Sequence, residues 1–243
     1  PILGDVTEVG GGVSDLAVGD VVMGVTLGRE MPGMIPQYLS VPRHQVIAIG
    51  PELSRGAHYS ALSDALVGFS SLRDAGQVKV GQRVLVLSSM SAPGFMGVQI
   101  VRNMGAEAIV GANSEHVGRL RSVGAAEVWE LSMERLLSRI NELHVVYDPM
   151  GVTHLGQVKD CLRPSGRYIS PVPQFKRALD QVWSQATARL VNGIHVSRLV
   201  ERQIETRDLD VIESDLRAGR LSVDGTDSLP LRALLDIEID EWR

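Results

Sequence analysis

Residues 80–94, VGQRVLVLSSMSAPG, decide the fold of this 243-residue chain. The apolar run from Val84 to Leu87 is typical of a short strand that is buried on both faces of a sheet. A serine-rich turn follows, and the apolar spacing from Gly97 to Met104 predicts a helix. The stretch therefore predicts the first strand–turn–helix unit of an α/β domain.

The same alternation continues along the chain. Further strands are expected at residues 108–110, 143–147 and 167–170, and further helices at residues 114–123 and 155–162. Continuous apolar strands that alternate with helices of about ten residues are typical of a parallel sheet covered on both faces. The sequence therefore predicts an α/β fold with a doubly wound parallel sheet.

The flanking segments follow other patterns. Residues 1–50 alternate short Val and Ile runs with glycines, which predicts a compact β domain. The remaining patterns predict a helix at 58–75, a helix from Phe175 to about Leu190, a strand at 194–200 and a helix at 209–218. We interpret residues 206–221 as a solvated amphipathic helix rather than an interaction tail.

Composition excludes several classes of protein. The apolar fraction of 44% is ordinary for a globular protein, and the net charge of −5 offers no basic field for nucleic acid. No apolar run approaches the roughly 20 residues that span a bilayer, and no signal peptide is recognisable. The single cysteine, Cys161, excludes an internal disulfide and reads as a small buried hydrophobic residue. We expect a cytoplasmic protein.

Several motifs in a specific order carry a family resemblance. They are VSDLAVGDVVMG at 13–24, VGQRVLV at 80–86, NMGAE at 103–107, VGAA at 123–126, VVYDPMG at 145–151 and LRPSGRY at 162–168. Together they resemble the medium-chain dehydrogenase/reductase superfamily. The resemblance implies part of a GroES-like, substrate-side β domain at 1–50, a Rossmann-like dinucleotide-binding domain at 51–205, and a segment at 206–243 that returns toward the small domain.

The resemblance points to the zinc-independent arm of this superfamily. Residues 24–42 lack the cysteines of a structural zinc site, and the histidines form no i, i+4 pair. That leaves the quinone oxidoreductases and enoylreductases, and the sequence Val22-Met23-Gly24 favours polyketide synthase enoylreductases. Because Pro1 opens the chain on a strand already in progress, we expect a piece of a longer synthase.

The resemblance also identifies the cofactor turn. The family pattern is Ala-x-x-Gly-x-x-Gly, in which glycines let the backbone approach a pyrophosphate at a helix N-terminus. Here Ser88 and Ser91 occupy the first two marked positions and Gly94 the third. Either the serine hydroxyls still hold phosphate, or Gly94 serves only the packing of helix on strand; we favour packing. The candidate cofactor-binding residues in this turn are Ser88, Ser89, Met90, Ser91, Ala92, Pro93 and Gly94.

Three further residues are cofactor candidates. At the end of the second strand stand Asn113 and His116, with Arg119 one turn later, and a basic side chain there implies NADPH rather than NADH. Asp148 either hydrogen-bonds a cofactor amide or starts a turn, and we favour the turn.

The usual proton donors of polyketide synthase enoylreductases are missing from the matching positions. Pro173 stands at the lysine position and Phe175 at the aspartate position. Tyr38 and Lys176 remain as weak catalytic candidates, with packing and solvation as their alternative roles. A degenerate turn and a missing acid together indicate relaxed selection on reduction.

Three functional hypotheses follow from the resemblance. The first is an enoylreductase-like synthase domain with impaired or no reduction and a structural role, self-associating as a homodimer through the strand at 193–197. The second is an active NADPH-dependent reductase of an enoyl thioester carried by acyl carrier protein, with neighbouring synthase domains as partners. The third is a free-standing quinone oxidoreductase. The expected cofactor is NADPH or none, without zinc, nucleic acid or membrane.

Overall fold

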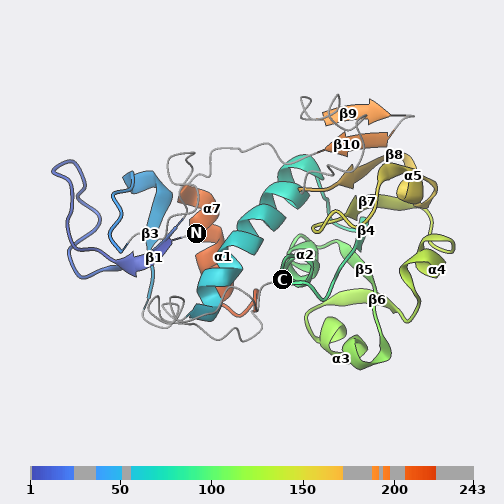
Figure 1. The fold of residues 1–243 in the computed structure, drawn as a ribbon, viewed down its shortest axis with the longest axis horizontal. Coiled ribbons are helices and arrows are strands. Elements are labelled where there is room, and N and C mark those ends of the chain that lie inside the picture. Colours follow the sequence, from blue (N-terminus) through green and yellow to red (C-terminus); the bar gives the residue numbers. More distant parts are fainter. Residues whose placement is uncertain are drawn as a thin grey trace, which may run out of the picture.

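Figure 1 shows the fold of the chain in a computed structural model. The structure describes residues 2–24, 37–50, 56–171, 188–191, 194–197 and 206–222. Two sheets organise this part of the chain, one of three strands and one of seven, with helix α1 (Gly56–Phe69) running between them.

The larger sheet has the strand order β6-β5-β4-β7-β8-β10-β9, in which all neighbours are parallel except β10 and β9. Its order reverses beside β4, which creates the crevice at the strands' carboxyl ends where doubly wound folds bind ligands. Its strands are β4 (Arg83–Val86), β5 (Glu107–Gly111), β6 (Ala125–Trp129), β7 (Leu143–Tyr147), β8 (Leu162–Ile169), β9 (Ala188–Val191) and β10 (Ile194–Ser197).

Helices cover both faces of this sheet because successive side chains on each strand point to opposite sides. Val84 and Val86 join a buried cluster with residues of α1, of α2 (Ala92–Asn103) and of α7 (Thr206–Arg217). Leu85 and Leu87 join a second cluster with residues of α4 (Met133–Leu137) and α5 (Leu155–Val158). Helix α3 (Ser114–Ser122) adds its buried Leu120 to the first cluster. The predicted doubly wound α/β fold is confirmed.

The smaller sheet is antiparallel and consists of β1 (Ile2–Asp5), β2 (Val21–Gly24) and β3 (Val46–Ala48). A short 3-10 helix, Arg43–Gln45, leads into β3. The β character predicted for residues 1–50 is present in these strands. The division of the whole chain at residues 50 and 205 stays a prediction.

Several predicted elements need correction. The helix at 58–75 is α1 followed by the π-helix Ser70–Ala75, and the helix at 155–162 ends early as α5 and the 3-10 helix Lys159–Cys161. Leu162 already opens β8, because its strand pairs with β7 from that residue. Residues 188–191 form β9 where a helix was predicted; an Asn-Gly pair follows them, which favours a tight hairpin to β10 over a continued helix. Strand β6 and helix α4 were not predicted.

The segment after α7 is tied back to α2 by one buried amide. The Gln99 side chain donates to the Ser222 carbonyl at 3.0 Å and accepts from the Ser222 N–H at 2.7 Å and its hydroxyl at 3.0 Å. Leu209, Ile212 and Leu216 of α7 are buried in the main core. The predicted amphipathic helix therefore exists, and it packs against α1 and β3.

Candidate cofactor site

The turn between β4 and α2 closes hydrogen bonds within itself. Ser91 is the N-cap of α2, and its hydroxyl donates to the Ser88 carbonyl at 2.8 Å while accepting from the Gly94 N–H at 3.2 Å. The Ser91 N–H donates to the same Ser88 carbonyl at 2.8 Å. Ser88 has a φ of +49°, a conformation that serine adopts at a cost. The turn is held together by its own serines.

Packing is sufficient to require a glycine at position 94. A Cβ built at this position would lie 2.1 Å from the Ser88 carbonyl oxygen, which is a backbone atom and cannot move aside. Gly97, one turn later, has the same role against the Tyr147 ring, 2.7 Å from its would-be Cβ. These two glycines let α2 approach β4 and β7 whether or not a ligand binds, in keeping with the packing role that the sequence favoured.

Few N–H donors remain for a pyrophosphate at the start of α2. A helix N-terminus binds anions through its first unpaired N–H groups. Of these, Pro93 has none, and the N–H of Gly94 already donates to Ser91, which leaves that of Ala92 in the first three helical positions. Ser89 is buried and its hydroxyl donates to the Gly111 carbonyl at 3.3 Å; Met90 packs against the core. The residues present fit a dinucleotide pyrophosphate poorly.

The end of β5 gives a mixed electrostatic environment. Asn113 is exposed and is the N-cap of α3 without a side-chain hydrogen bond. The His116 Nε2 lies 3.3 Å from the Glu115 carboxylate, and the Arg119 guanidinium lies 4.8 Å from the Phe95 ring centroid. A 2′-phosphate at His116 would therefore meet a neighbouring carboxylate, and Arg119 stacks on α2.

Asp148 is fully buried at the carboxyl end of β7 and accepts four hydrogen bonds from local donors. Its carboxylate accepts from the Val152 N–H at 3.0 Å, from the Thr153 N–H and hydroxyl at 2.7 and 2.8 Å, and from the Tyr168 hydroxyl at 3.2 Å. Three of these bonds end on Oδ2 and one on Oδ1, so most of the carboxylate's roughly four lone-pair positions are used locally. The arrangement agrees with a turn-forming role for Asp148.

Of the two catalytic candidates, the structure describes only Tyr38. Tyr38 is exposed, at 73% of its full accessible surface, beside the small sheet. Lys176, like Pro173 and Phe175, lies outside the described residues. Their roles stay predictions.

A buried polar cluster beneath α1 escaped the sequence reasoning. The hydroxyls of Tyr147 and Ser71 are both buried, and neither makes a hydrogen bond of normal geometry within the described part of the chain. Burial raises the pKa of Tyr147, and Asp64 and Asp148 add to that rise while the Ser71 hydroxyl opposes it. Burial also raises the pKa of Asp64. In sequence these residues read as ordinary strand and helix positions.

Three further features complete the description. Among the described residues there is no group of three or more His, Cys, Asp or Glu side chains placed to hold a metal ion. Cys161 is buried as predicted, with its Sγ 3.1 Å from the Leu137 carbonyl oxygen. None of the helices in the described part has the length and apolar character needed to cross a bilayer.

Comparison with known proteins shows that the chain is similar to quinone oxidoreductases and polyketide synthases. No protein-family model matches it. A probable quinone oxidoreductase from Leishmania amazonensis is 30% identical over 156 residues, which cover 61% of this chain and 44% of that protein. A spectinabilin polyketide synthase system protein from Streptomyces orinoci is 29% identical over 179 residues, 69% of this chain and 8% of that protein. The chain thus spans less than half the length of these relatives.

A solved structure of an enoyl reductase has a similar fold. The crystal structure of the CurK enoyl reductase superposes with a TM-score of 0.75 at 17% identity, over 96% of this chain and 72% of the other. At this identity the likeness shows a common fold. It agrees with the two-sheet architecture derived above.

Proposed function

The chain belongs to the medium-chain dehydrogenase/reductase superfamily, in its quinone oxidoreductase-like arm close to polyketide synthase enoylreductases, and on this premise we propose that it is an enoylreductase-like synthase domain with impaired reduction. Its role is then structural within a larger synthase. The similarity to quinone oxidoreductases and polyketide synthases supports membership of the superfamily, which the sequence predicted. The proposed loss of reductase activity is based on the geometry of the candidate cofactor site.

The observation that carries the proposal is the self-bonded turn before α2. Hydride transfer from a nicotinamide needs the dinucleotide held through its pyrophosphate. Pro93 removes one N–H donor, and Ser91 occupies another through its hydroxyl. Any dinucleotide would therefore bind weakly, and NADPH is the form we propose because His116 and Arg119 are basic, although Glu115 lies 3.3 Å from His116.

The proposed partners follow from the synthase relatives. They are neighbouring domains, an acyl chain tethered to acyl carrier protein, and a second copy of the chain. Strand β10 is already paired on both sides, by β8 and β9, so the strand predicted for self-association cannot pair again. We assign that role to β9 (Ala188–Val191), the edge of the sheet. The proposed domains remain residues 1–50, 51–205 and 206–243.

The test is cofactor binding to the natural chain and to a repaired turn. In the double variant Ser91→Gly/Pro93→Ala, the Gly94 N–H is released and a further N–H is restored, while glycine at an N-cap costs only a few tenths of a kcal/mol. We expect no binding of NADPH or NADH to the natural chain at micromolar concentration, and an affinity gain of about tenfold or more in the variant. Ser132→Gly, at the N-cap of α4, is the matched control.

Other results of this binding test would favour the two alternative functions. A micromolar dissociation constant for NADPH in the natural chain would refute impaired binding and favour an active enoyl-thioester reductase. Reduction of a quinone but not of a crotonyl thioester would favour the quinone oxidoreductase hypothesis, in keeping with the name of the Leishmania relative.

A further inference from the structure

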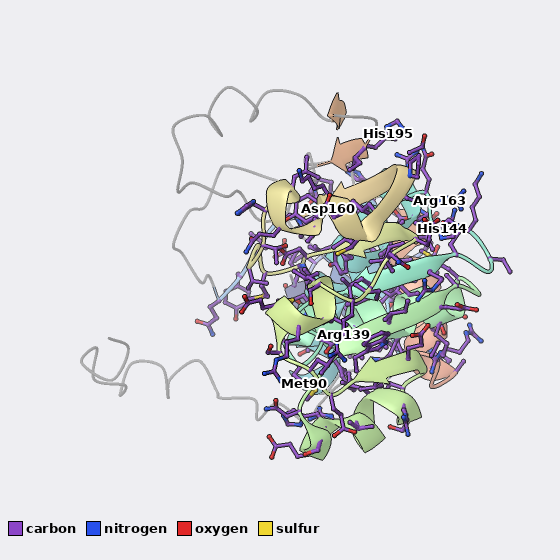
Figure 2. All side chains as sticks on the ribbon, turned by 90° about the vertical axis from the view of Figure 1, so that its right-hand side faces the viewer. Met90, Arg139, His144, Asp160, Arg163 and His195 are labelled. Carbon is purple, nitrogen blue, oxygen red and sulfur yellow. The ribbon has the colours of Figure 1, made fainter. Side chains whose placement is uncertain are left out.

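A polar pocket lies at the amino ends of the strands of the large sheet, whereas the cofactor turn lies at their carboxyl ends. Its volume is about 460 Å³, within the range of small-molecule sites. It opens beside the amino ends of β4 and β7, and Figure 2 shows His144 and Arg163 together at the edge away from Met90. Its lining residues are Gly76, Gln77, Lys79, Gln82, His144, Val145, Arg163, Pro164, Ser165 and Arg167.

A bulge in β8 builds one wall of this pocket. Leu143 of β7 pairs with Leu162, and Val145 pairs with Arg167, so that residues 163–166 of β8 stand opposite the single residue His144. Bulges of this kind re-aim side chains and are frequent beside functional sites. Here the bulge brings Arg163 against the imidazole ring of His144.

The pocket concentrates positive charge in a chain whose net charge is −5. Lys79, Arg163 and Arg167 line it, and within the described part of the chain none of the three pairs with a carboxylate. Arg167 donates to the Ala75 carbonyl and to the Gln77 side-chain oxygen, both neutral acceptors. These three side chains therefore make no ion pair with the described residues, and the negative charges that act on His144 are those of Glu142 and Glu107.

His144 adds an excess of donors. Its Nδ1 lies 3.2 Å from the Arg83 N–H, and its Nε2 lies 2.8 Å from the Arg163 guanidinium. A neutral imidazole has one lone pair and one N–H, so it can accept from only one of these two donors. With Nδ1 accepting, the Nε2–H and the Arg163 guanidinium meet as two donors 2.8 Å apart, and neither has an acceptor in this contact.

Residues with a strained backbone conformation are concentrated around this pocket. Four non-glycine residues in the described part have positive φ, and two of them, Gln77 at +48° and Ser165 at +63°, line the pocket. A third, Glu142 at +55°, lies two residues before His144. Strained backbone persists where the surrounding structure maintains it, and it is concentrated at functional sites.

We propose that this pocket binds the phosphate group of a small phosphate ester. A phosphate oxygen would accept from the Nε2–H of His144 and from Arg163, with Lys79 as a further charge, and a dianion would balance the unpaired cations. The pocket is larger than a phosphate ion, so it has room for part of an organic group. The site is separate from the cofactor turn and does not depend on the proposed function.

Calorimetric titration with inorganic pyrophosphate, AMP and 4′-phosphopantetheine tests the proposal, with chloride at matched ionic strength as background. The His144 ring proton signals in NMR spectra, assigned by His144→Gln, report whether the pocket itself is occupied. We expect binding with a shift of those signals, and a loss of affinity of about tenfold or more in Arg163→Gln and Lys79→Gln. Arg139→Gln, an exposed arginine away from the pocket in Figure 2, is the matched control and should bind as the natural chain does.

The outcomes are distinct. Tighter binding of AMP than of 4′-phosphopantetheine identifies a nucleotide as the source of the phosphate, and the reverse order identifies a pantetheine arm. Equal affinity of Arg163→Gln and Arg139→Gln, binding without a shift at His144, or no heat with any probe at millimolar concentration would overturn the proposal. Lys79 is exposed, so its variant keeps the test valid if the Arg163 variant fails to fold.

Discussion

Replacing Gly94 by alanine tests whether this glycine serves packing. Its added methyl would lie 2.1 Å from the Ser88 carbonyl oxygen and 2.7 Å from the Ser88 carbonyl carbon. Ordinary contacts of a Cβ begin at about 3.4 Å, so helix and turn would have to separate by roughly 1 Å. Because both partners are backbone, no side-chain rotation relieves the clash.

The expected cost follows from overpacking. Forcing a methyl into a filled site costs about 3 kcal/mol at the upper end of the usual range, offset by up to about 1 kcal/mol from the higher helix propensity of alanine. We therefore expect Gly94→Ala to lower the free energy of unfolding by about 2 kcal/mol and the Tm by about 4–8 °C.

The matched control is Gly118→Ala in α3, where nothing lies within 4 Å of the added Cβ. There we expect a gain of about 0.5–1 kcal/mol, because alanine favours a helix more than glycine does. Urea and thermal unfolding, without nucleotide, measure both variants. Equal stability of Gly94→Ala and the natural chain would refute the packing argument and leave close approach to a ligand as the reason for the glycine.

The remaining predictions concern buried polar groups. Asp148→Ala leaves the buried donors of Thr153 without an acceptor, so it should lower the free energy of unfolding by about 3–5 kcal/mol in urea titrations. The control Asp160→Ala, at an exposed position, should change it by less than about 0.5 kcal/mol. Similar urea midpoints for the two variants would contradict this prediction. Burial, and next the Asp160 charge, raise the pKa of the Cys161 thiol, so iodoacetamide should label it about 100-fold or more slowly in the native than in the urea-unfolded chain, and rapid native labelling, followed by mass spectrometry, would show an accessible thiol. Burial raises the pKa of Asp64, which means that folding disfavours its ionised form: Asp64→Asn should stabilise the protein at neutral pH, and the gain in urea midpoint should disappear as the pH falls toward about 4, while a gain independent of pH would have another cause.

Much of the fold was predictable because the central strands are continuous apolar runs. Val84 to Leu87 and Val145 to Tyr147 are buried on both faces, and such runs are not typical of surface elements. Strand β6 was missed because Glu127 interrupts its apolar pattern, and its position comes from pairing with β5. Tertiary pairing likewise sets where β8 begins.

The cofactor turn was predictable as a place but not as a hydrogen-bond network. Sequence spacing identifies Ser91 and Gly94, yet the hydroxyl of Ser91 can point at a ligand or at its own backbone, and only the structure shows that it bonds Ser88 and Gly94. The pocket at the other edge had no sequence signal. His144 and Arg163 meet because β7 and β8 pair out of simple register.

The hydrogen bonds between Gln99 and Ser222 can form only after Ser222 has been synthesised. The two residues are 123 positions apart in the chain. A ribosome adding about 5–20 residues per second needs roughly 6–25 s to synthesise that distance. During this interval α2 exists without the partner of its buried amide, and Leu209, Ile212 and Leu216 have not yet covered the same face of the sheet. The nascent chain therefore exposes an incomplete core for seconds, a period in which it is open to chaperones and aggregation, and the synthesis of α7 and Ser222 ends that period.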